Sequence, residues 1–151
     1  MLSTLLPTLT SLAALPAILH SPHPQSPPLI LSSIFSTLYH LSEKNARGHN
    51  LSGIALFDND EVVLLLLDRV AAVWASVAVL RAVWRAPGAF ERVVRRVIGG
   101  VGVALVAAGV GELGGGLWYA VFHSVWHVGI YWVAFVCCQE VDRGRGAAPS
   151  R

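Results

Sequence analysis

Charged residues are scarce in this chain of 151 residues, and that scarcity narrows the possible folds. Asp, Glu, Lys and Arg together make up 13 % of the sequence, whereas an ordinary soluble domain has about a quarter. Hydrophobic residues make up 54 %, so a soluble fold would lack the polar surface that it needs. The composition therefore argues against an ordinary soluble domain and predicts an integral membrane protein.

Cysteine is scarce too, and the two present, Cys137 and Cys138, are neighbours in the sequence. Two adjacent thiols cannot build a disulfide framework or a thiolate metal site. Apolar packing is the favoured role for them, with palmitoylation as the alternative. The basic residues are mostly arginines beside apolar segments, and no basic stripe is interleaved with aromatics. We therefore expect membrane lipids as partners and no nucleic acid.

Five apolar segments predict an all-α, polytopic transmembrane helix bundle with about five spans. These segments are Leu2–Leu19, Pro28–Leu41, Val62–Trp84, Val97–Gly111 and Leu117–Cys138. The chain then divides into an N-terminal apolar segment with a Pro-rich link (1–27), a helix bundle (28–138) and a polar C-terminal tail (139–151). The tail is expected to fray after Glu140. The first segment lacks a basic n-region, which favours a span, and a cleaved signal stays open as the alternative.

The arginines predict how the bundle sits in the membrane. An Arg-rich connector is expected between the third and fourth segments, and more arginines follow the fifth. With five spans and the N-terminus outside or luminal, both groups share the cytoplasmic side with the C-terminus, as the positive-inside rule requires. The sequon Asn50-Leu51-Ser52 would then lie outside, a weak glycosylation signal. Gly109 to Gly114 is expected to form a flexible hinge before the fifth segment.

Five polar residues inside the spans are the candidate functional residues, because polar groups are costly in a bilayer. Ser36 and His40 are four residues apart and share one helix face, as do His123 and His127. Asp68 lies about two turns into the third segment. In the five-span topology, the histidines and Asp68 fall within roughly 10–15 Å of the outer boundary, so they are expected to converge on one site.

Three neutral imidazoles with an open fourth position are typical of catalytic zinc sites, which makes His40, His123 and His127 candidate zinc ligands. Zinc lowers the pKa of bound water to about 7. Asp68 would take the proton or orient a ligand, and Ser36 would donate a hydrogen bond to a developing oxyanion. A membrane hydrolase is therefore one hypothesis.

Plainer interpretations compete with this one. The two histidines of the fifth segment could belong to an aromatic belt at the membrane surface. Asp68 could pair with Arg69 or Arg81 near a membrane edge, although adjacent residues point to different helix faces. Ser36 could simply bond the backbone of its own helix.

The candidate residues resemble the three motifs of the CREST superfamily. Phe35–His40 matches its Ser-x-x-x-His motif, Leu67-Asp68 its aspartate, and His123–His127 its His-x-x-x-His motif. The group includes alkaline ceramidases, progestin and adipoQ receptors with the hemolysin III proteins, and myomaker-like proteins. Tyr39–Glu43 looks closest to the myomaker-like branch. The resemblance implies a seven-helix fold, three histidine zinc ligands with Ser36 and Asp68 as polar partners, and hydrolysis of a lipid amide or ester.

The chain departs from that superfamily in the number of helices. Only about 55 residues separate Asp68 from His123, which leaves room for one intervening helix where the superfamily has three. Losing two helices preserves the direction of the last one. The alternatives to a hydrolase are a non-catalytic multi-pass protein, receptor-like or membrane-remodelling, and a truncated inactive copy.

Overall fold

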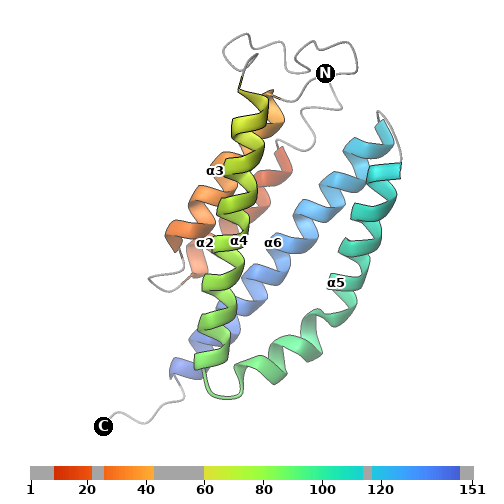
Figure 1. Cartoon of the computed structure of the whole chain (residues 1–151). Coiled ribbons are helices and arrows are strands. Elements are labelled where there is room, and N and C mark those ends of the chain that lie inside the picture. Colours follow the sequence, from red (N-terminus) through yellow and green to blue (C-terminus); the bar gives the residue numbers. More distant parts are fainter. Residues whose placement is uncertain (1–8, 22–25, 43–59, 114–116, 147–151) are drawn as a thin grey trace.

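The computed structural model describes residues 9–21, 26–42, 60–113 and 117–146, and these residues form a bundle of helices (Figure 1). The helical elements are η1 (Ser11–Ala14), α2 (Leu15–His20), α3 (Ser26–Ser42), α4 (Glu61–Arg85), α5 (Ala89–Leu113) and α6 (Leu117–Gly146). The all-α class and the number of about five helical segments are thereby confirmed. The sequon and the Pro-rich stretch 22–25 lie outside the described residues.

Three of these helices are long and apolar enough to cross a membrane, which indicates a membrane protein. The spanning stretches are Glu61–Arg85, Ala89–Val110 and Trp118–Gly146. No more than 33 % of the most apolar part of each stretch is buried inside the bundle. Their outer faces carry large exposed side chains such as Leu66, Val73 and Trp74. Apolar surface on this scale suits a hydrocarbon surrounding better than water.

The two N-terminal helical pieces are shorter, and proline explains where they begin. Pro16 lies in the first turn of α2, and Pro27 and Pro28 lie in the first turn of α3. A helix start tolerates proline because the first backbone N–H groups have no partner within the helix. Helix α3 therefore begins two residues before the predicted start, inside the Pro-rich link.

Three segments that were expected to interrupt the helices are at least partly helical instead. The Arg-rich connector shrinks to the turn at residues 86–88, and Arg92, Arg95 and Arg96 lie on α5. Helix α6 continues past Glu140 to Gly146, so the first part of the expected tail does not fray in this structure. The hinge expected from Gly109 is wrong over its described part, because α5 runs on to Leu113.

Small side chains hold the lower part of the bundle together, where α4, α5 and α6 meet (Figure 1). The principal contributors from these three helices are Ala75, Val79, Ala82, Val83, Ala89, Val93, Val97, Val136, Cys137, Cys138 and Val141. Small residues allow helices in a membrane to approach closely. Both cysteines are buried in this core, which supports packing over an exposed acylation site.

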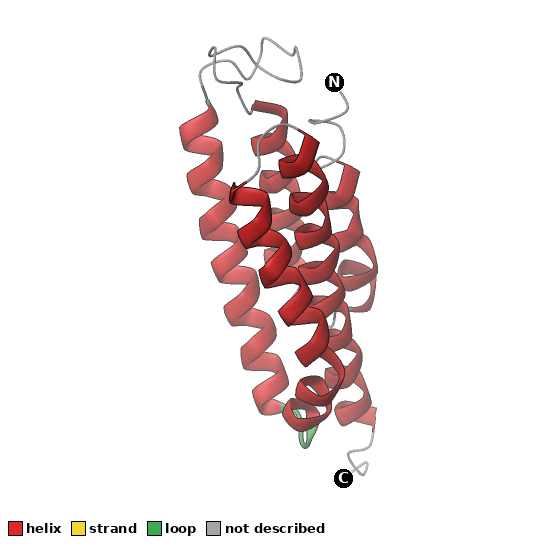
Figure 2. Ribbon diagram, turned by 90° about the vertical axis from the view of Figure 1, so that its right-hand side faces the viewer, coloured by secondary structure: helices red, strands yellow, loops and turns green. Residues whose placement is uncertain are grey.

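Figure 2 shows the helices lying side by side along the length of the bundle. Helix α5 packs mainly on α6, and α3 packs mainly on α4. The backbones of α3 and α6 are not among the closely packed pairs. Contact between these two helices therefore depends on side chains that reach across.

The turn between α4 and α5 requires glycine, which provides a test of the fold. Gly88 has φ = 66°, and a Cβ there would lie 2.8 Å from a terminal nitrogen of Arg92. We expect Gly88→Ala to lower the free energy of unfolding in mixed micelles by about 1–2 kcal/mol, because left-handed backbone disfavours a Cβ.

Gly102→Ala is the matched control for that variant. Gly102 lies inside α5, and a Cβ added there would meet no neighbouring atom within 4 Å, so alanine is expected to be neutral or stabilising. Equal stability of the Gly88→Ala protein and the wild type would contradict the turn described here.

Candidate metal centre

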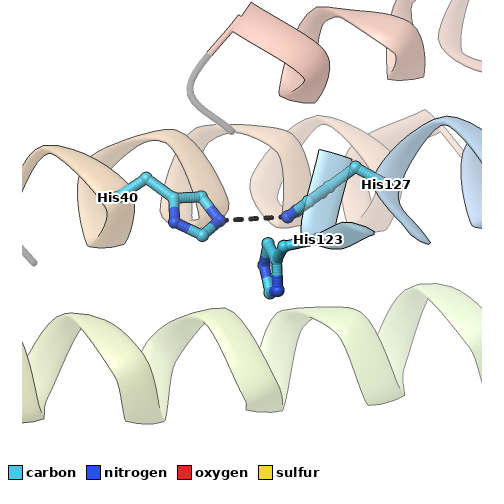
Figure 3. A group of neighbouring side chains, drawn as sticks. All are labelled: His40, His123 and His127. Carbon is cyan, nitrogen blue, oxygen red and sulfur yellow. Dashed lines mark hydrogen bonds between the residues drawn. The ribbon is translucent and has the colours of Figure 1, made fainter. Parts of the chain in front are cut away.

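Three histidines from two helices form one cluster (Figure 3). His40 comes from the last turn of α3, and His123 and His127 come from successive turns of α6. One ligand atom from each lies within 4.8 Å of the other two, so the group could hold a metal ion. The predicted convergence of these histidines is therefore what the structure shows.

The three rings form a nearly equilateral triangle. The ring centroids are 4.9 Å apart for His40 and His123, 5.1 Å for His40 and His127, and 4.8 Å for His123 and His127. Three imidazoles bound to one ion in tetrahedral geometry, with metal–nitrogen bonds of about 2.0–2.1 Å, have centroids about 5 Å apart. The ring spacing therefore fits a shared metal ion.

The ring nitrogens need only small adjustments for this purpose. The Nε2 atoms of His40 and His127 lie 3.0 Å apart and share a hydrogen bond, with one ring donating and the other accepting. Tetrahedral coordination places two such nitrogens about 3.3 Å apart. Small side-chain rotations would thus exchange this hydrogen bond for coordination of an ion.

Burial distinguishes these histidines from residues of a membrane-surface belt. His40 is 1 % exposed, His127 is 7 % exposed, and His123 is half-buried. The three rings point toward one another from facing helices (Figure 3). Removing an imidazole from water without partners is unfavourable, so a shared role for the three rings explains their burial.

Asp68 lies on α4 beside this cluster. Its carboxylate lies within electrostatic range of His40 and of Arg69. Within the described residues Asp68 forms no salt bridge with Arg69 or Arg81. The described residues therefore do not show the ion pair at a membrane edge that the plainer interpretation expected.

Ser36 is buried on the same face of α3 as His40. Its hydroxyl accepts a hydrogen bond of 3.4 Å from the Ser11 hydroxyl, and it lies within hydrogen-bonding reach of the Tyr131 hydroxyl. Ser33 donates to the backbone carbonyl of Ser11 at 3.0 Å. The interactions described for Ser36 are therefore with other elements, whereas the plainer interpretation expected a bond to its own helix.

Tyr131 is a neighbour of the site that the sequence reasoning missed. It is 6 % exposed, its ring is tilted against that of His127 with centroids 6.0 Å apart, and its hydroxyl reaches Ser32 and Ser36 on α3. The signal was present in the spacing, because Tyr119, His123, His127 and Tyr131 follow one another at four-residue intervals on one face of α6.

Comparison of the chain with protein-family models, curated proteins and solved structures gave no match in any of the three. Membership of the CREST superfamily therefore stays a prediction that rests on the motif residues.

Metal content provides the direct test of the cluster. We expect the purified protein to carry about one divalent ion per chain, and His40→Ala, His123→Ala and His127→Ala each to lose it, because two imidazoles hold an ion far less tightly than three. Elemental analysis by mass spectrometry measures this ratio.

His20→Ala is the control for these variants. His20 is exposed, and its ring packs edge-on against Phe135 away from the cluster, so the metal content should be unchanged. Wild-type protein that stays free of metal after exposure to a divalent ion would contradict the assignment.

Proposed function

We propose that this membrane protein is a zinc-dependent hydrolase that cleaves an amide or ester bond of a lipid. The observation that supports the proposal best is the triangle of three imidazoles with nearly equal spacing, two of them buried and the third half-buried. Neutral imidazoles are common zinc ligands, and a three-histidine set leaves a coordination position open for water or substrate. Zinc is part of the proposal, since the ligand set suits other imidazole-binding ions as well.

Different residues of the chain would have different roles in such a reaction. A bound zinc ion would act as a Lewis acid that activates water and polarises the scissile carbonyl. Asp68 would accept the proton that the attacking water loses and pass it to the leaving amine or alcohol. The hydroxyls of Ser36 and Tyr131 are candidate donors to the carbonyl oxygen as it gains negative charge.

A lipid is the proposed substrate because of where the cluster lies. Its histidines belong to α3 and α6, and α6 is apolar enough to span a membrane. A substrate that is itself dissolved in the bilayer can reach a site among membrane-spanning helices without leaving the hydrocarbon. Soluble substrates would first have to cross the polar boundary.

A second function is supported by a different observation. Two apolar grooves lie between α5 and α6, and none of the three histidines lines either one. The cluster also joins α3 to α6, whose backbones are not closely packed. An ion that only links these helices, in a receptor-like or membrane-remodelling protein, would explain both facts.

Turnover on lipids is the test of the catalytic proposal. With a panel of lipid amides and esters in detergent, we expect the zinc-loaded protein to release fatty acid. Asp68→Asn should retain zinc but lose turnover by about 10²–10⁴-fold, the usual contribution of a general base. Asp142→Asn, at an exposed position near the end of α6, is the matched control and should remain active.

The alternative predicts a different pair of results. If the ion is structural, zinc binds at one per chain, no lipid of the panel is cleaved, and chelation lowers the free energy of unfolding. At a zinc concentration 100 times the Kd, bound zinc adds about 2.7 kcal/mol to that free energy. Zinc binding without turnover would therefore sink the hydrolase and retain the metal centre.

A further inference from the structure

A second polar cluster lies at the opposite end of the bundle from the histidines. Glu140 on α6 is completely buried, and three arginines bind its carboxylate. Arg92 Nε donates to Oε2 at 2.8 Å, and Arg96 and Arg143 each donate to Oε1 at 2.6 Å. Three cations surround one anion, so the cluster carries an excess of positive charge.

The three arginines are not bound equally. Arg92 also donates to the backbone carbonyls of Pro87 and Glu140, which fixes its guanidinium between the α4–α5 turn and α6. Arg96 and Arg143 each use one nitrogen on Glu140, although a guanidinium carries five N–H donors. Their side chains are 41 % and 62 % exposed. Two guanidiniums are therefore held together with donors left for a further anion.

The cluster lies where three spanning stretches end. Arg96 is in the second turn of α5, Arg143 is in the last turn of α6, and the turn after α4 is beside both helices (Figure 1). The exposed rings of Trp84 and Phe90 flank that turn, with centroids 5.2 Å apart. Aromatic side chains in such positions are typical of the membrane–water boundary, the level at which lipid phosphates lie.

The surroundings of the cluster are basic as well. Among the described residues, this end of the bundle has seven arginines but only three carboxylates. The arginines are Arg81, Arg85, Arg92, Arg95, Arg96, Arg143 and Arg145. Of the carboxylates, Glu140 is shared by three arginines and Glu91 pairs with Arg95. The third, Asp142, is exposed. The field at this end of the bundle therefore attracts anions from the adjoining leaflet.

We propose that Arg96 and Arg143, positioned by Glu140, bind the phosphate group of an anionic phospholipid. The forked donors of arginine match phosphate oxygens. Arg96 and Arg143 lie where the spanning stretches end, and this position suits a lipid headgroup rather than a soluble anion. Glu140 is a positioning residue, because it brings two like charges together and leaves their outer donors available. The inference stands independently of the hydrolase proposal.

Lipid retention tests the site in the intact protein. The chain is reconstituted in phosphatidylcholine bilayers that contain phosphatidylserine, extracted gently, and its bound lipids are measured by mass spectrometry. We expect selective retention of phosphatidylserine by the wild type. Arg96→Gln and Arg143→Gln should each lower this retention about five-fold, the effect expected for one basic residue at a charged membrane surface.

Three further variants separate a built site from general charge. Arg95→Gln removes one positive charge from the same helix but from a pair with Glu91, so retention should fall much less. Glu140→Gln should lower retention, because the two guanidiniums lose the carboxylate that holds them together and repel each other. The double variant Arg96→Lys and Arg143→Lys keeps both positive charges but loses the forked guanidinium donors, so retention should fall. It also covers the case in which the glutamine variants fail to fold.

Two outcomes would overturn the proposal. Equal losses in Arg95→Gln and Arg96→Gln would reduce the effect to diffuse electrostatics. Displacement of phosphatidylserine by inorganic phosphate, with phosphate binding also in pure phosphatidylcholine, would assign the cluster to a soluble anion. Helical circular dichroism on every variant shows that the bundle is intact when retention is measured.

Discussion

Every polar side chain on a membrane helix needs a partner inside the protein, because the surrounding hydrocarbon offers none. Two groups of polar residues in the described part of the bundle illustrate this constraint. One is the histidine triangle with Asp68, Ser36 and Tyr131, and the other is Glu140 with its arginines. Outside these groups, Ser76 and Ser124 donate to the carbonyls of their own helices four residues back. Apolar faces can pack in several ways, whereas these pairings specify which faces meet.

The two groups connect different helices to α6. The glutamate cluster joins α6 to the start of α5, in the region where small side chains already pack closely. The histidine cluster joins α6 to α3, across a gap that the backbones do not close. Polar contact therefore reinforces packing at one end and replaces it at the other. The hydrogen bond between His40 and His127 could be replaced by a shared ion, so this contact between α3 and α6 is also a place where an ion or a substrate can bind.

Much of this arrangement could be predicted from the sequence, because local patterns determine it. Apolar runs located the helices, and four-residue spacing placed His123 with His127 on one face. The errors came from partners far away in the sequence. Arg92 and Arg96 suggested a polar connector and Glu140 the start of a tail, because nothing local shows that they bind each other over more than forty residues. Likewise Gly109 suggested a hinge, although an apolar surrounding favours helix wherever backbone groups must pair internally.

The separation of the histidines along the chain bears on how the protein is made. His40 lies on a helix that is synthesised before α4 and α5, and its two partners follow 83 and 87 residues later on α6. During translation two spanning helices, α4 and α5, are therefore made between His40 and its partners. An ion that needs all three histidines as ligands would bind only after α6 has been inserted. Metallation of such a site would mark molecules whose insertion is complete.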